Sequence, residues 1–191
     1  KLARAIPTAQ TYPSAQAVAD VADSVFVTTP DDAIHRVISS VRWRRDQEIV
    51  HCSGADSLEV MEPAAQAGAH VGAFHPLQTF ASVDQAIDNL AGSTFALEAE
   101  EPLLSMLKQM ATDLEGHWVV LQPGDKVLYH AAAVIACNYV VTLVKLATDL
   151  WDVFGVSQAE ATRALLPLLK GTINNISHVG LPNCLTGPIA R

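Results

Sequence analysis

Short apolar and β-branched runs alternate with stretches of helical periodicity through the first part of the chain. This rhythm is typical of strand–helix–strand units, which build a parallel sheet with helices on its faces. The predicted strands are residues 24–29, 48–53, 70–75, 93–97 and 117–121. The predicted helices are residues 30–42, 57–67 and 102–114. Thr29 is expected to cap the first helix, with Pro30 at its first position.

The pattern then becomes purely helical. Pro and Gly in the segment 122–125 punctuate this change, so the segment is predicted to be a hinge. We therefore expect two domains, residues 1–122 and residues 123–191. A helix from about Asp125 to Phe154 is apolar on nearly every face, which predicts packing by its own chain and by the second subunit of a homodimer.

A last helix is predicted after this long one. Ser157 and Glu160 have the spacing of a capping box at its start. Leucines at 165, 166, 168 and 169 give it an apolar face, and Pro167 is expected to bend it.

The long apolar helix also raises the question of a membrane span. Residues 127–144 carry no formal charge and approach the length that a span requires. Polar side chains interrupt them, however, and no second span accompanies them. A buried core helix is therefore favoured over a membrane span. No signal peptide is visible at Lys1.

Composition is that of a compact globular protein, with 50% hydrophobic and 17% charged residues. The net charge of −8 disfavours a nucleic-acid partner. Arg42, Arg44 and Arg45 around Trp43 form the one basic cluster, which is too short to follow a phosphate backbone. It is expected to be a solvated helix end, with contact to a 2′-phosphate as the alternative.

The cysteines and histidines restrict the setting further. Cys52, Cys137 and Cys184 are far apart, which predicts neither disulfides nor a thiolate zinc site and favours a reduced, cytoplasmic protein. The scattered histidines at positions 35, 51, 70, 117 and 178 lack the spacing of metal ligands, so no metal is predicted.

No Gly-x-Gly-x-x-Gly occurs, although a dinucleotide-binding domain ordinarily opens with one. Residues 1–12 predict no first strand, and Arg191 falls in a stretch rich in Pro and Gly. We therefore expect both ends of such a fold to lie outside this chain. Without the turn that receives the pyrophosphate, the chain is expected to bind dinucleotide poorly, and the preference between NAD and NADP stays open.

Candidate cofactor-binding residues lie at the ends of two of the predicted strands. Ligands of a doubly wound sheet sit beyond the carboxyl ends of its strands, and these segments share one edge of the sheet. Ser53 offers a hydroxyl and Gly54 an unhindered backbone, with a simple turn as the alternative. The cofactor-binding candidates are Thr28, Thr29, Pro30, Ser53 and Gly54.

His75 ends the third predicted strand. An imidazole there can take or give the proton that accompanies hydride transfer, with a structural loop histidine as the alternative. On the long helix, His130 and Asn138 are two turns apart and within about 80° of one another around the axis. Both could face a cleft between the lobes, with hydrogen-bonded core groups as the alternative.

The chain resembles the Rossmann-like proteins with a C-terminal domain of unknown function, which are described as proposed NADP oxidoreductases. The resemblance covers nearly the whole chain, and its most specific parts are His-Pro-Leu-Gln-Thr-Phe and Leu-Thr-Gly-Pro-Ile-Ala-Arg. It implies an incomplete Rossmann-like parallel sheet domain followed by an all-α domain like the C-terminal domain of 6-phosphogluconate dehydrogenase. The segments that carry it are residues 51–54, 72–80, 132–143 and 185–191.

That family is similar to prephenate dehydrogenases, whose strand-end serine and later His-Pro correspond here to Ser53 and His75-Pro76. The resemblance implies that His75 lies at the substrate and Ser53 near the nicotinamide. The 6-phosphogluconate and β-hydroxyacid dehydrogenases use a lysine one turn before a helix asparagine. Asn138 matches that asparagine, but residue 134 is Val, so the resemblance supplies no lysine for acid/base chemistry.

The expected function is hydride transfer between NADP or NAD and an unknown small substrate in the interdomain cleft. His75 would act as acid or base, Ser53 would polarise or position the substrate, and Asn138 and His130 would hold its polar groups. No arginine pair suits a dicarboxylate, so prephenate itself is not expected. The alternatives are a non-catalytic dinucleotide-binding sensor or a helical dimerisation module.

Overall fold

The computed structural model describes residue 6 and residues 8–186. It divides into two compact units, Lys1–Ala133 and Val134–Arg191. The division falls later than the boundary predicted after residue 122. The physical reason is that the first turns of helix α7 (Asp125–Ala136) contact the sheet of the first unit.

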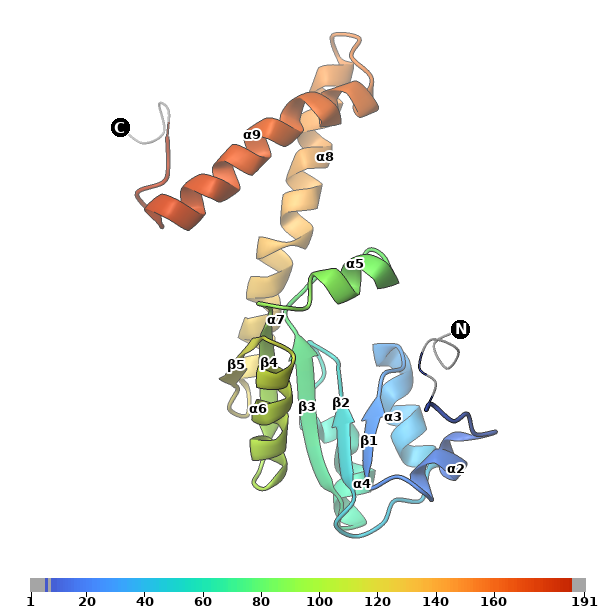
Figure 1. The fold of residues 1–191 in the computed structure, drawn as a ribbon. Coiled ribbons are helices and arrows are strands. Elements are labelled where there is room, and N and C mark those ends of the chain that lie inside the picture. Colours follow the sequence, from blue (N-terminus) through green and yellow to red (C-terminus); the bar gives the residue numbers. More distant parts are fainter. Residues whose placement is uncertain (1–5, 7, 187–191) are drawn as a thin grey trace. The chain divides into compact units, whose positions relative to one another are not determined.

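The first unit is built on a five-stranded sheet in the order β1 to β5 (Figure 1). Strands β1 (Ser24–Val27), β2 (Glu48–His51) and β3 (His70–Pro76) are parallel. Strand β4 (Thr94–Ala99) is antiparallel to β3, and β5 (His117–Val120) is parallel to β4. The sheet is thus mostly parallel, as predicted. The direction of β4 departs from the prediction because the chain turns back after β3, so that Pro76 pairs with Phe95.

Five α-helices and a 3-10 helix precede α7 in the described part of this unit. In Figure 1, α6 lies over β4 and against its neighbours β3 and β5. The helices are α2 (Ala15–Ala19), α3 (Asp31–Ser40), the 3-10 helix η1 (Leu58–Met61), α4 (Glu62–Gln66), α5 (Val83–Asp88) and α6 (Leu103–Asp113).

The start of α3 corrects one prediction. Pro30 occupies the N-cap with an extended ψ of 148°, and no side chain caps the helix. The helix therefore begins at Asp31, and the prediction that Thr29 caps it was wrong because the backbone at Pro30 is not yet helical. Asp31 and Asp32 occupy the first turn, where their charge suits the positive end of the helix dipole.

Two buried apolar clusters hold the sheet. One contains Ile34 and Ile38 of α3 with Ile49 of β2, and the other contains Phe95 of β4 with Leu107 of α6. Since side chains alternate along a strand, residues 49 and 51 of β2 point to the face that α3 covers. Burial of each large apolar side chain contributes about 1.5–3 kcal/mol, so these clusters fix the strands whose carboxyl ends carry the polar residues described below.

The second unit is helical. Helix α8 (Asn138–Asp152) follows a break at Cys137, and a short loop leads to α9 (Gln158–Val179), which contacts α8 (Figure 1). The single long helix that was predicted is therefore two helices. Pro167 lies inside α9, as expected from the sequence.

The prediction that the chain itself packs around the long helix was wrong. Many large apolar side chains of α7 and α8 are exposed, including Leu128 at 76%, Val141 at 68% and Leu150 at 69%. The apolar side chains of α7 and α8 form a larger surface than the other described residues of the chain cover. The second subunit that was predicted alongside stays a prediction.

By length and composition alone, the helical stretch Asp125–Asp152 is apolar enough to cross a membrane, with a mean hydropathy of 1.8. Its first turns contain the buried Lys126 and bear Tyr129, which is hydrogen-bonded to the sheet residue His75. Beyond the break at Cys137, α8 has 15 residues and contains the exposed pair Lys145 and Asp149. Because a span requires about 20 apolar residues, these features disfavour a membrane crossing.

The capping box at the start of α9 gives the first prediction. The Ser157 hydroxyl accepts a hydrogen bond from the Glu160 amide, and the Glu160 carboxylate accepts from the Ser157 amide in return. Ser157→Ala should lower the free energy of unfolding of the second unit by about 1 kcal/mol. Urea unfolding checks this, with Ser177→Ala on the exposed surface of the same helix as the control. Equal effects of the two changes would contradict the role of the box.

Candidate functional site

The carboxyl ends of β1, β2 and β3 lie side by side. Val27 pairs with His51, and His51 pairs with Ala73. The three loops that were singled out from the sequence therefore share one edge of the sheet, as predicted. Thr28, Thr29 and Pro30 are exposed at the end of β1.

The turn after β2 is fixed by its own polar groups. His51 is fully buried, and its Nδ1 accepts a hydrogen bond from the Ser53 amide at 3.1 Å. The Ser53 hydroxyl accepts from the amides of Ala55 and Asp56, at 3.2 and 3.0 Å. Ser53 is itself buried, so its hydroxyl holds the turn in shape and presents Gly54.

Gly54 lies where two histidines approach the backbone. A Cβ at this position would stand 2.6 Å from His75 Nε2 and 3.0 Å from His130 Nδ1. Only glycine leaves room for both rings at this distance. The close approach brings together Ser53, Gly54, His75 and His130, four of the residues predicted from the sequence.

Gly54→Ala should therefore disturb the site. Overpacking costs about 1–3 kcal/mol, and less where a side chain can turn away, so we expect the protein to fold with both imidazoles displaced. Imidazole ¹⁵N NMR of His75 and His130, together with urea unfolding, checks this. Gly171→Ala is the control, because a Cβ there meets nothing within 4 Å and should be neutral or slightly stabilising. Unchanged imidazole signals in Gly54→Ala would contradict the packing.

His75 is held by the hydroxyl of Tyr129, which lies 2.7 Å from its Nδ1, with the two rings edge to face. Burial, reinforced by the charges of Lys126 and His130, lowers the pKa of His75 to about 4. Burial raises the pKa of Tyr129 to about 12. At neutral pH the imidazole is therefore uncharged and the phenol is protonated, which makes His75 a neutral hydrogen-bonding group.

The start of α7 presents three polar side chains on one helix face. Lys126, Tyr129 and His130 are spaced i, i+3 and i+4, which places them together. Lys126 is 4% exposed, and its Nζ lies 3.8 Å from Oε2 of Glu98 on β4. That distance is too long for a hydrogen bond, so the pair interacts by charge alone.

Glu98 lies in the same row of the sheet as His51, because both pair with Ala73. Paired residues point to the same face, so the carboxylate and the imidazole share the face that α7 contacts. Burial lowers the pKa of Lys126 and raises that of Glu98. The charge of Glu98 opposes the shift at Lys126, and the charge of Lys126 opposes the shift at Glu98. Burial, with Lys126 and then His75, also lowers the pKa of His51 to about 3.

Several buried polar atoms around this edge have no hydrogen-bond partner. Folded proteins pair nearly all such atoms, with protein groups or with bound molecules. Their concentration here indicates a place where a small polar ligand or water completes the hydrogen bonds. The atoms are His51 Nε2, Asp56 Oδ2, Glu98 Oε2, Lys126 Nζ and His130 Nδ1.

Sequence reasoning missed Lys126, Glu98 and Tyr129. Lys126 was read as part of an apolar helix, and Glu98 lies inside an apolar strand. The spacing of Lys126, Tyr129 and His130 on one helix face is the signal that could have found them. Asn138, the remaining candidate, is exposed as the first residue of α8 in the second unit, and its carbonyl accepts a hydrogen bond from Thr142.

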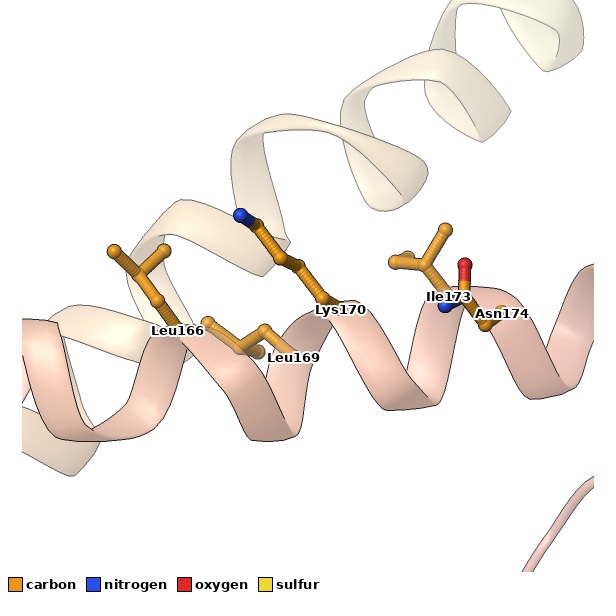
Figure 2. A pocket seen from close by; sticks show the side chains of 5 residues that line it. All are labelled: Leu166, Leu169, Lys170, Ile173 and Asn174. Carbon is orange, nitrogen blue, oxygen red and sulfur yellow. The ribbon is translucent and has the colours of Figure 1, made fainter.

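The described residues show no metal cluster and one depression on the second unit. No group of three or more His, Cys, Asp or Glu there is arranged to hold a metal ion. A depression of about 300 Å³ lies along α9, and Figure 2 shows its lining side chains on one side of that helix. It is lined by Leu166, Leu169, Lys170, Ile173 and Asn174.

Solved structures similar to this chain share its fold. TM1727 from Thermotoga maritima has 31% identity and a TM-score of 0.74, over 86% of this chain and 62% of that one. The proposed NADP oxidoreductase BF3122 from Bacteroides fragilis has 22% identity and a TM-score of 0.66, over 90% and 65%. A reductive aminase from Aspergillus terreus, in complex with NADPH and ethyl-5-oxohexanoate, has 14% identity and a TM-score of 0.66, over 85% and 57%.

The chain thus spans less than two thirds of the length of each of these proteins. The last two likenesses show the fold, a Rossmann-like, mostly parallel sheet followed by long helices. No curated protein matches the chain. A family model described as a domain of unknown function, DUF2520, matches residues 93–191, more than half of the chain. The chain therefore belongs to the DUF2520 family.

Proposed function

We propose that this chain contributes the substrate-side residues of an NAD(P)-dependent oxidoreductase that acts on a small polar compound. The observation that carries the proposal is the group of unpartnered buried polar atoms on β2, the turn that follows it, β4 and the start of α7, beside the carboxyl end of β2. In open α/β sheets this edge is where ligands bind. Proteins of the same fold include a 1-pyrroline-5-carboxylate reductase and a reductive aminase in complex with NADPH, which supports this reading.

The residues present fit the reacting end of a nicotinamide dinucleotide. Ser53 and Gly54 form a fixed turn at the sheet edge, next to the exposed Thr28, Thr29 and Pro30. The start of α3 carries Asp31 and Asp32, whose charge is unsuited to a phosphate. The residues at these strand ends would therefore hold the nicotinamide rather than the phosphates. When bound, the dinucleotide supplies or accepts hydride.

The protein's own groups would bind and orient the substrate. His75, neutral and fixed by Tyr129, would contact the polar atom beside the reacting carbon. His130, with an unpartnered Nδ1 close to Gly54, would bind a second polar group. Asn138 lies in the second unit, and its part in substrate binding stays a prediction of the family resemblance.

The proposal is tested by a turnover screen. NADPH and NADH oxidation is followed by absorbance with a panel of simple ketones, aldehydes and imines. The assay uses this chain and the same chain preceded by the N-terminal segment of TM1727. Turnover of any panel member in either form supports an oxidoreductase. Dinucleotide binding with no turnover across the panel would favour the sensor alternative instead.

We also propose that the chain functions as a cytoplasmic homodimer. The exposed apolar side chains of α8 and α9, such as Val141, Leu150 and Leu168, give each helix a face that a monomer rarely leaves in water. A second copy of the chain would cover them. Light scattering of the purified protein should give twice the mass of the 20.4 kDa chain, and a monomer at high concentration would contradict the proposal.

A further inference from the structure

Lys126 is a buried amine that the fold does not require. It is 4% exposed, and its Nζ has no hydrogen-bond partner. A lysine side chain at the surface of α7 would cost nothing to solvate, whereas a buried and unpartnered ammonium is costly. Its position one turn before His130 places it on the helix face that meets His75 and Gly54.

We propose that Lys126 is the proton donor of this site, and that it delivers a proton from Nζ to the carbonyl oxygen or imine nitrogen of the substrate. This inference rests on the proposed function. The N–H bond of Lys126 breaks and an O–H or N–H bond forms on the substrate. The electron pair of the C=O or C=N bond moves to that atom as the carbon receives hydride from the reduced dinucleotide. The neutral amine then regains a proton from water.

The other titratable groups at this edge are poorly suited to that role. His51 and His75 have pKa values lowered to about 3 and about 4, so neither imidazole carries a spare proton at neutral pH. Burial raises the pKa of the Cys52 thiol to about 11 and that of Tyr129 to about 12. Both groups are therefore weak acids.

Lys126 differs from them in charge and in surroundings. Glu98 on β4, Asp56 after β2 and Asp31 on α3 all favour its ammonium form, while burial makes that ammonium more acidic than an exposed lysine. Burial therefore makes the Nζ proton easier to release than that of an exposed lysine, while the three carboxylates oppose its loss. Glu98 acts as a positioning residue, since its carboxylate holds the ammonium without forming a hydrogen bond to it.

The test measures the acidity and accessibility of Nζ directly. The chain has five lysines, at positions 1, 108, 126, 145 and 170, so acylation by acetic anhydride can be followed at each by mass spectrometry. The acylation rate of each lysine rises with pH, and the midpoint, the pH at which it reaches half its maximum, should be lower for Lys126 than for Lys145, an exposed lysine paired with Asp149. Glu98→Gln removes a charge that favours the ammonium, so it should lower the Lys126 midpoint further and leave Lys145 unchanged.

Turnover supplies the second readout. With any substrate found in the panel, Lys126→Met should slow turnover by about 10²–10⁴-fold with the Kd for NADPH little changed. Lys126→Arg keeps the charge and guards against misfolding, and it should also lose turnover, because a guanidinium does not release its proton in the accessible pH range. Acylation of Lys126 with the same midpoint as Lys145, or no acylation at any pH, would overturn the proposal.

The two proposals fail differently. Absence of NADPH binding would contradict the oxidoreductase. The midpoint of Lys126 acylation would then still lie below that of Lys145. Normal NADPH binding and turnover in Lys126→Met would contradict the proton donor and leave the oxidoreductase standing.

Discussion

His75→Ala is expected to slow turnover by about 10²–10³-fold, which is the usual cost of removing one preorganised hydrogen-bonding group from a reacting centre. The imidazole is fixed by the Tyr129 hydroxyl at 2.7 Å and lies against Gly54. Because the ring is neutral at neutral pH, its contribution is a directed hydrogen bond rather than a charge. Cofactor affinity should change little, since Ser53 fixes its turn through the amides of Ala55 and Asp56 and does not use this ring.

His35→Ala is the matched control, because His35 is exposed on α3. Tyr129→Phe should give an intermediate loss, since it keeps the ring packing and removes the hydroxyl that orients His75. Steady-state kinetics with NADPH and a panel substrate make the comparison. Equal turnover in His75→Ala and His35→Ala would remove His75 from the site.

Acidification is expected to weaken the first unit. The folded-state pKa values of His51 and His75 lie below the ordinary value of 6.5, so between pH 6.5 and about 4 the unfolded chain binds protons that the folded chain does not. Stability from these groups is fully present above pH 6.5 and is lost as the pH falls toward their folded-state values. From pH 6.5 to pH 5 the loss should be about 2 kcal/mol for His51 and less for the half-buried His75.

His51→Asn isolates this effect. Asparagine can still accept from the Ser53 amide and cannot titrate, so the variant should lose less stability than the wild type over the same pH interval. Urea unfolding at pH 7 and pH 5 measures the difference, with tryptophan fluorescence from Trp43 and Trp118 in a Trp151→Phe background. Because Glu98 titrates in both proteins, its contribution cancels. Parallel losses in wild type and variant would contradict the burial of a neutral His51.

The strands of the first unit could be predicted because their apolar and β-branched runs are short and bounded by turn residues. Strand β3, His70 to Pro76, is one example. Strand β2, which the turn at Ser53-Gly54 follows, is another. The shared edge followed directly, since the carboxyl ends of neighbouring parallel strands must meet. The proximity of Gly54 and His75 was therefore within reach of sequence reasoning, whereas the position of His130 beside them depends on how α7 meets the sheet.

Lys126 and Glu98 were out of its reach for a physical reason. Each belongs to a segment whose apolar pattern is dominated by other residues, and their pairing depends on how α7 meets β4. The reversal of β4 was similarly hidden, because the direction of a strand depends on its connection rather than on its composition. The exposed faces of α7 and α8 show that an apolar pattern does not say what will cover it.

The central claim is that the strand-end residues belong to a nicotinamide dinucleotide site, and equilibrium titration of NADPH and NADH tests it most directly. The titration follows cofactor fluorescence with this chain, with the form preceded by the N-terminal segment of TM1727, and with Gly54→Ala in that form. We expect micromolar or tighter binding to the extended form, weaker binding to the 191-residue chain, and a loss of about tenfold or more in Gly54→Ala. No binding of either dinucleotide to the extended form, or equal binding with and without the Gly54 change, would contradict it.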